Sequence, residues 1–90
     1  MKDERLEALI EHDVAELRAA FPQIAEVRSS LESWKEGEAR RYSVGLDIRW
    51  AGHQTLVSGP ARSGVHEAVQ AAFDAARERL RAGCAHVGAG

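Results

Sequence analysis

The part of this sequence that most limits the fold is the segment Arg40–Trp50, near the middle of the chain. Apolar and polar residues alternate strictly along it, and the apolar set is Tyr42, Val44, Leu46, Ile48 and Trp50. Neighbouring side chains of a strand point to opposite faces, so the alternation predicts a β-strand with one buried face and one wet face. We interpret this segment as the middle strand of a small antiparallel sheet, with helices packed on its apolar side.

Two further strands are expected, one on each side of the central segment. Ile24–Ser33 precedes it and is separated from it by a polar turn at Lys35–Glu38 that contains a glycine. His53–Ser58 follows it after a tight Ala-Gly turn. The buried face of this last strand stays open, because Leu56 and Val57 are neighbours and compete for it.

Two amphipathic helices flank the predicted strands. The first runs from about Asp3 to Phe21, and the second runs from a cap at Ser63 to about Ala82, with Gly83 as a natural stop. Their apolar stripes are Leu6, Leu9, Ile10, Val14, Leu17 and Phe21, and Val65, Ala68, Val69, Ala72, Phe73, Ala76 and Leu80. The sequence therefore predicts an α+β fold of order α-β-β-β-α, an antiparallel three-stranded sheet with two helices packed on one face. We expect one domain at residues 1–83 and a flexible tail at 84–90.

Composition excludes several classes of protein. The net charge is −2, without the strong basic footprint of a dedicated nucleic-acid binder. No apolar run is long enough to span a bilayer, and the acidic N-terminal segment is not a signal peptide. A single cysteine, Cys84, allows no internal disulfide. We expect a cytoplasmic protein without a membrane partner.

The segment LVSGPARSGVHEAVQAAFDAARERL, residues 56–80, resembles the ribosome hibernation-promoting factor and protein Y family of ribosome-associated inhibitors, also known as the sigma-54 modulation family. The likeness continues through AAFPQIAEVRSSLES and RRYSVGLDIRWAGHQTLV, and covers roughly residues 5–81. Members of that family fold as β-α-β-β-β-α, bind the small ribosomal subunit through ribosomal RNA and hold ribosomes inactive. The resemblance therefore implies a ribosome-associated translation inhibitor that is not an enzyme.

The chain departs from this family in two ways. We expect it to lack the opening strand of the family, since the sequence starts at the first helix. The positions where the family often carries lysine are occupied here by Asp13, Glu16 and Ala75. These departures favour an alternative, a protein-interaction or self-association module that keeps the fold without RNA binding. The element order also resembles the double-stranded RNA-binding domain, but the second helix starts SGVHEAVQ, without the lysine cluster which that module requires.

Five arginines are candidates for contacts with RNA phosphates. They are Arg77, Arg81 and Arg79 on the second helix, Arg62 in the loop before it, and Arg18 on the first helix. The competing interpretation, which we favour, is a solvated helix surface on which Asp74 and Glu78 pair locally with the arginines. On the outer face of the sheet, acidic neighbours dilute Arg28, Arg41 and Arg49, so a mixed surface is expected there.

Nothing in the sequence predicts a catalytic, metal or cofactor site, or a small-molecule substrate. The histidines His12, His53, His66 and His86 lack the spacing of metal ligands, and Cys84 stands near His86 without a further partner. Trp34 lies at a strand end, where we expect a partly exposed ring that packs at the sheet edge.

The first strand is expected to form an edge of the sheet, and unguarded edges pair with other chains. The sequence therefore predicts a homodimer, formed either by antiparallel pairing of Ile24–Ser33 with its copy or through apolar surface beside it. The residues expected at this contact are Val27, Ser29 and Leu31, and proline at Val27 or Ser29 should dissociate an edge-paired dimer.

Overall fold

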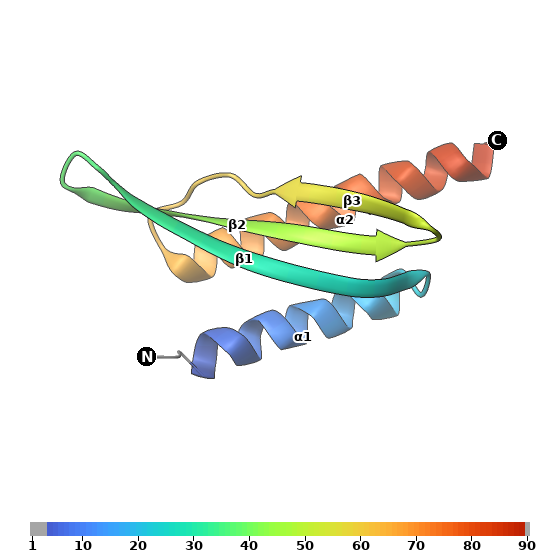
Figure 1. Ribbon diagram of the computed structural model, residues 1–90, viewed down its shortest axis with the longest axis horizontal. Coiled ribbons are helices and arrows are strands. Elements are labelled where there is room, and N and C mark those ends of the chain that lie inside the picture. The colour runs from blue at the N-terminus through green and yellow to red at the C-terminus, as the bar shows by residue number, and fades with distance from the viewer. Residues whose placement is uncertain (1–3, 90) are drawn as a thin grey trace.

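The computed structural model describes residues 4–89 of the 90-residue chain, with side chains described for residues 4–83. The elements are α1 (Glu4–Ala20), β1 (Ile24–Glu36), β2 (Ala39–Trp50), β3 (His53–Ser58) and α2 (Val65–Ala89). The strands form one antiparallel sheet in the order β1-β2-β3, and both helices lie on one side of it (Figure 1). The predicted α+β class, the element order and the central position of the alternating strand are confirmed.

The alternation in β2 divides the sheet into a face covered by helices and an open face. On the face that points to the helices, Tyr42 is partly buried. Four further side chains there are almost completely buried, at 8% exposure or less: Val44, Leu46, Ile48 and Trp50. Val57 of β3 lies opposite Leu46 and is 5% exposed, whereas its neighbour Leu56 lies opposite Asp47 and is 65% exposed. The register with β2 therefore decides which face of β3 is buried, which the sequence left open.

The two helices cover the sheet unequally. α2 packs closely through its predicted stripe, and a Cβ atom built on Gly59 would lie only 2.8 Å from the Cβ of Ala72. The residues of this stripe that are buried are Ala68, Val69, Ala72, Phe73, Ala76 and Leu80. In α1, by contrast, Leu17 is buried while the rest of the stripe is partly buried against the core. The N-terminal half of α1 therefore keeps apolar surface within reach of solvent.

Both predicted hairpin turns are present. Gly37 has a φ of 66°, as expected for the first position of a two-residue turn between β1 and β2. Ala51 and Gly52 have φ values of 50° and 78°, so the β2–β3 turn has the left-handed backbone at both central residues. These turns fix the register on both sides of β2.

The ends of α2 differ from those expected. The N–H of Ala68 donates to the carbonyl of Gly64 at 3.0 Å, so Gly64 and not Ser63 is the N-cap residue. The helix continues through Gly83, which packs under Trp50: a Cβ there would lie 3.1 Å from the indole ring. Gly83 thus permits a close approach rather than ending the helix. The backbone of α2 reaches Ala89, within the segment expected to be a tail, and the side chains from residue 84 onward lie outside the described part.

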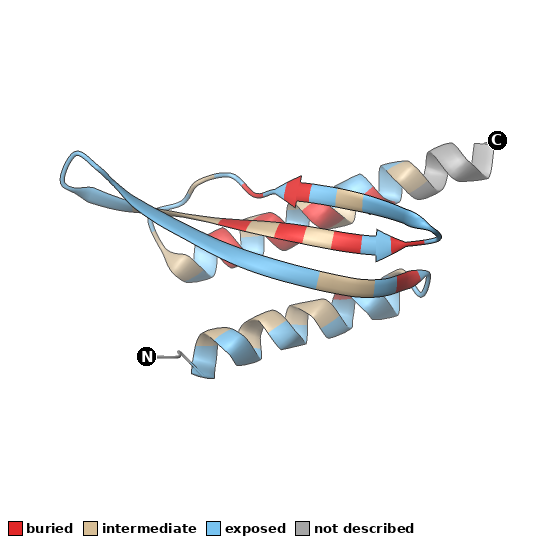
Figure 2. Cartoon of the chain, in the orientation of Figure 1, coloured by how far each residue is buried: buried red, intermediate tan, exposed pale blue. Residues whose placement is uncertain are grey.

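β1 is longer than predicted and continues from Ser33 to Glu36. Every residue of its second half, Ser29–Glu36, is exposed. Figures 1 and 2 show why: the β1–β2 hairpin extends beyond the ends of both helices, and its tip is pale blue on both strands. We call Ser29–Glu36 the distal edge of β1.

Candidate functional site

Arg77, the first of the predicted RNA contacts, joins the two helices. Its Nη1 donates to Oδ1 of Asp74 at 2.9 Å, and its Nη2 lies 3.8 Å from Oε2 of Glu16 on α1. The guanidinium is therefore shared between two carboxylates. A phosphate group would have to displace these partners and approach against their negative charge, so Arg77 is a poor contact for RNA.

Arg77 and Glu16 also line an open groove of about 420 Å³ between the helices. Leu9 and Phe73 supply its apolar lining, and His66 and Gln70 stand beside it with Arg77. The remaining lining residues are Asp13 and Glu16. Burial raises the pKa of Asp13 above its ordinary value of 3.8, and the positive charge of Arg77 offsets part of this rise. The groove is acidic on balance, which suits neither phosphate nor RNA.

The other four predicted arginines are exposed. Arg18, Arg79 and Arg81 make no ion pair with any residue in the described part of the chain. Arg81 follows Arg77 by one helical turn, whereas Arg79 lies across the helix from both. Arg62 is held by its backbone, because its N–H and carbonyl both bond Tyr42 at 2.8 Å. The guanidinium of Arg62 also donates to the carbonyl oxygen of Ala61 at 3.1 Å, whereas those of Arg18, Arg79 and Arg81 are available to a ligand.

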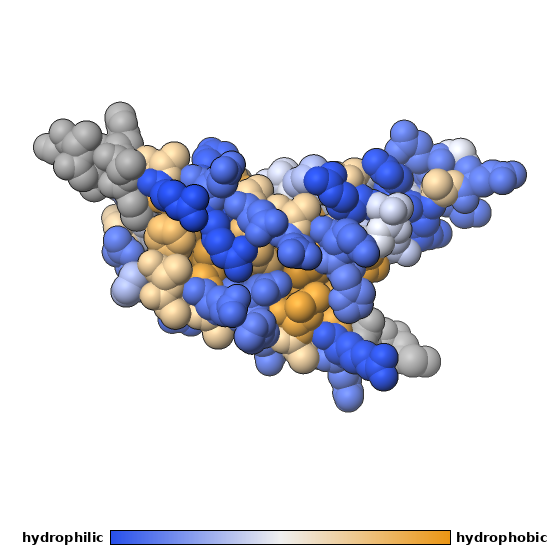
Figure 3. Space-filling model, turned by 180° about the vertical axis from the view of Figure 1, so that it is seen from behind, coloured by the Kyte–Doolittle hydropathy of each residue, from blue (hydrophilic) through white to orange (hydrophobic). Residues whose placement is uncertain are grey.

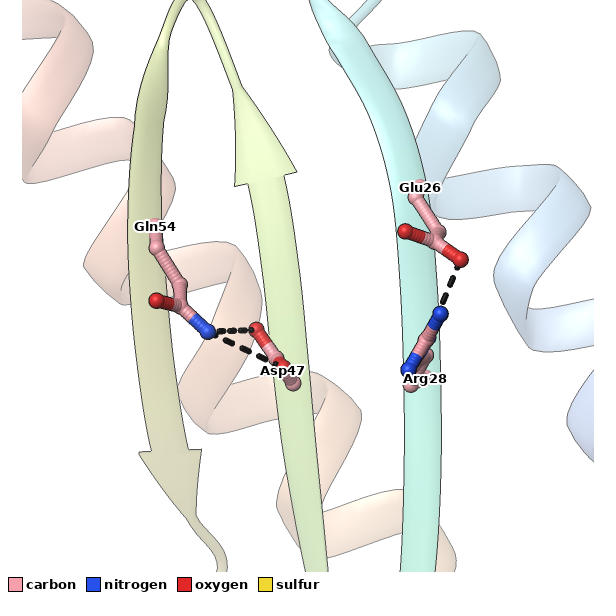
Figure 4. A network of polar contacts seen from close by, with 4 residues as sticks. All are labelled: Glu26, Arg28, Asp47 and Gln54. Atoms are coloured by element: carbon pink, nitrogen blue, oxygen red, sulfur yellow. Dashed lines mark hydrogen bonds and ion pairs between the residues drawn. The ribbon is translucent and has the colours of Figure 1, made fainter.

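The open face of the sheet carries charges of both signs that pair with one another. On β1, Nε of Arg28 donates to Oε1 of Glu26 at 3.0 Å (Figure 4). Between β3 and β2, the amide nitrogen of Gln54 donates to both carboxylate oxygens of Asp47, at 3.0 and 3.1 Å. A shallow hollow of about 270 Å³ lies over Gly45, where no side chain fills the centre of the sheet. This face matches the mixed surface expected from the sequence.

Two large apolar side chains are exposed on opposite faces of the distal edge. Leu31 pairs with the buried Val44 and therefore points to the helix side, yet it is 44% exposed. Trp34 pairs with Arg41, points to the open side and is 38% exposed. The partly exposed ring of Trp34 was expected, but its face could not be assigned until β1 was known to continue to Glu36.

An apolar recess of about 200 Å³ opens beside Leu31, between the sheet and the start of α1. Apolar surface beside Ile24–Ser33 was expected from the sequence as one of two possible dimer contacts, but the helix residues that line this recess were not identified. Seen from the helix side, apolar surface shows between polar side chains near the N-terminal end (Figure 3). The recess is lined by Leu6, Ile10, Ser29, Ser30, Leu31, Val44 and Val69, so it joins two of the three residues predicted for the dimer contact. Val27, the third, is partly buried against the core.

Two of the histidines contact residues other than histidine. The Nε2 atom of His12 lies 3.3 Å from Oε1 of Glu16. The ring of His53 packs edge-on against that of Trp50, with the ring centroids 6.5 Å apart. No three histidine, cysteine, aspartate or glutamate side chains within the described part gather so that they could hold a metal ion. The side chains of Cys84 and His86 lie outside that part. Neither helix, over the residues described, is long and apolar enough to cross a membrane.

With the fold and these surfaces described, the chain can be compared with known proteins. Comparisons with protein-family models, with curated protein sequences and with solved structures find no match.

Proposed function

We propose that this chain is a ribosome-associated domain that binds ribosomal RNA of the small subunit and inhibits translation, without catalytic activity of its own. The observation that supports this is the architecture: helix, three antiparallel strands and helix, with both helices on one face. The family resemblance implies this same arrangement after its opening strand. The exposed arginines supply the positive charge that contact with RNA requires.

The residues we propose for this role are the exposed Arg18, Arg62, Arg79 and Arg81. Arg77 is the weaker candidate, because its guanidinium already pairs with Asp74 and Glu16. Each arginine that contacts a phosphate releases counterions, so binding should weaken as salt rises. With four contacts, the logarithm of the binding constant should fall with that of the salt concentration at a slope of about −3.

Sedimentation of the protein with ribosomes on sucrose gradients tests this proposal. At low salt the chain should travel with the small subunit, and a variant with Arg79→Glu and Arg81→Glu should stay at the top. The matched control carries Arg28→Glu and Arg49→Glu, which change the net charge equally but lie on the open sheet face. If the unaltered chain stays at the top at low salt, the proposal is wrong. If both variants lost co-sedimentation with ribosomes equally, the effect of charge would be nonspecific.

A second candidate function is self-association, and the distal edge of β1 favours it. The backbone on its outer side pairs with no strand among the described residues, and both of its large apolar side chains are partly exposed. Exposed strand edges of this kind recruit further strands. Light scattering between micromolar and millimolar concentration tests for the dimer, and a monomer mass throughout would contradict it.

A further inference from the structure

The end of the β1–β2 hairpin carries positive charge that no residue in the described part of the chain neutralises. This end extends beyond both helices, and we call residues 33–42 the hairpin arm (Figure 1). Lys35 of β1 lies directly opposite Arg40 of β2, and both side chains are exposed. Like charges that face each other across two strands are destabilising. A local conflict of this kind is typical of a functional site.

Arg62 brings a third base to the same face of the arm. Its backbone N–H and carbonyl both bond Tyr42 at 2.8 Å, so the two residues lie directly opposite each other and their side chains share one face. Arg40 is two positions from Tyr42 along β2 and lies on that face as well. Arg40 is therefore a diagonal neighbour of Arg62, roughly 7–8 Å away and within reach of a long side chain. We call Lys35, Arg40 and Arg62 the basic cluster.

The acids near the basic cluster face elsewhere. Glu36 lies on the open face of the sheet, and Glu38 stands in the turn between the strands. Glu67 is the acid nearest to Arg62 in sequence, and its carboxylate lies against Gly64 at the start of α2. Among the residues whose side chains are described, none makes an ion pair with a base of the cluster. The cluster therefore keeps its full positive charge.

Neutral oxygen atoms hold two of the three bases in place. Nη1 of Arg40 lies 3.4 Å from Oγ of Ser33, to which it donates, and Nη1 of Arg62 donates to the carbonyl oxygen of Ala61 at 3.1 Å. These bonds orient the guanidinium groups without neutralising them, and they leave the other N–H groups available. A guanidinium fork binds two oxygen atoms of one phosphate group, and an ammonium group adds a further charge. The ligand chemistry that fits the cluster is therefore a phosphate.

We propose that the basic cluster binds the phosphate backbone of the small-subunit ribosomal RNA. This inference rests on the proposed function and adds Lys35 and Arg40 to the arginines named there. Arg79 lies roughly 20 Å along α2 from the start of that helix, beside which Arg62 stands. The chain thus contacts RNA at two separate places, at the hairpin arm and at the C-terminal half of α2.

Binding to purified small ribosomal subunits at several salt concentrations tests the basic cluster. With Lys35 and Arg40 added to the four arginines, the logarithmic slope of the unaltered chain should be about −5 instead of about −3. A variant with Lys35→Gln and Arg40→Gln should have a slope shallower by about 2. A fourfold rise in salt should then cost the unaltered chain roughly fifteenfold more affinity than it costs the variant. The matched control, Arg28→Gln with Arg49→Gln, removes the same charge from the open sheet face and should keep the original slope.

The outcomes separate this inference from the proposed function. Equal slopes for the variant and the unaltered chain would overturn the inference and leave the proposed function standing. A control slope as shallow as that of the variant would also overturn it, because the effect would then not depend on the arm. If the unaltered chain did not bind the subunits at low salt, both proposals would be wrong.

A benzophenone label at Ser33 identifies what lies on the cluster. It is attached to Ser33→Cys in a Cys84→Ser background, at an exposed position beside Arg40. Ultraviolet light should join the label to ribosomal RNA of the bound subunit. Cross-links to a ribosomal protein instead would indicate an acidic protein segment as the partner and would overturn the assignment to RNA.

Lys35→Glu distinguishes binding from a structural role. It replaces the like-charge pair with an opposite-charge pair across the hairpin, so the melting temperature should rise by roughly 2–6 °C. The affinity for small subunits should fall at the same time, because an acid now lies on the cluster. A lower melting temperature would show that Lys35 supports the hairpin itself, and unchanged affinity would show that it does not contact RNA. Either result would overturn the inference.

Discussion

The indole Nε1–H of Trp50 donates a hydrogen bond to the hydroxyl oxygen of Thr55 across the β2–β3 hairpin, with 2.8 Å between the two atoms. Trp50 is 8% exposed and its ring also packs against Gly83 of α2. This one side chain therefore joins the β2–β3 hairpin to the C-terminal half of α2. Its hydrogen bond matters because a buried indole N–H without an acceptor is costly.

Replacing Thr55 should reveal that cost. Thr55→Val keeps the shape of the side chain and removes the acceptor, so we expect the free energy of unfolding to fall by about 1–2 kcal/mol. Urea denaturation followed by tryptophan fluorescence measures the change. Thr55→Ser retains a hydroxyl and serves as the control. Equal loss of stability in the two variants would show that the hydrogen bond contributes nothing measurable.

Gly59 should be intolerant of any side chain. A Cβ atom there would lie 2.8 Å from the Cβ of Ala72, 2.9 Å from its Cα and 3.0 Å from the carbonyl oxygen of Val44. Two of these atoms belong to the backbone and cannot move aside cheaply. Gly59→Ala should therefore lower the free energy of unfolding by about 2 kcal/mol, measured by thermal or urea denaturation. Ser58→Ala, at the exposed neighbouring position, is the control and should change stability little.

The stability of the fold should respond to the protonation of Asp13. Its pKa is raised by burial, while Arg77 and His12 favour the charged form and Glu16 and Asp74 oppose it. The folded chain thus holds this proton more tightly than the unfolded chain does. The stabilisation from the neutral carboxyl is complete below the ordinary pKa of 3.8 and is lost as the pH rises through the raised value.

Asp13→Asn tests this linkage because asparagine does not titrate. The stability of the unaltered chain relative to this variant should fall as the pH rises from about 3 to about 7. Urea denaturation midpoints across that range give the comparison, and Glu11→Gln controls for removing one surface carboxylate from α1. A relative stability that stays constant or rises with pH would contradict the prediction.

The proposed dimer should depend on Leu31 and not on Leu56. Both leucines are exposed, at 44% and 65%, but Leu31 lies on β1 and Leu56 on the open face of β3. Leu31→Thr should weaken the dimer about tenfold, as expected for the loss of one apolar contact. Leu56→Thr should leave the dissociation constant unchanged. Analytical ultracentrifugation of both variants measures this, and equal weakening would place the contact elsewhere.

The alternation along Arg40–Trp50 by itself determined the centre of the fold. A period of two residues is a local property of a strand, and a strand this apolar on one face has to be covered on that face. The turns at Gly37 and at Ala51–Gly52 were also readable, because a left-handed backbone favours glycine at fixed positions. The stripe of α2 could be predicted for the same reason, since its spacing of three and four residues is local.

Only the tertiary structure decided which of Leu56 and Val57 is buried, because the register with β2 sets the face of β3. It also decided that Gly83 lies within a helix, since the reason for a glycine there is the Trp50 ring, distant in sequence. The ion pair between Arg77 and Glu16 also depends on tertiary structure, because it requires α1 and α2 to lie side by side. The exposure of Leu31 and Trp34 depends on where the helices end beside the hairpin, and a sequence pattern carries no information about that distance.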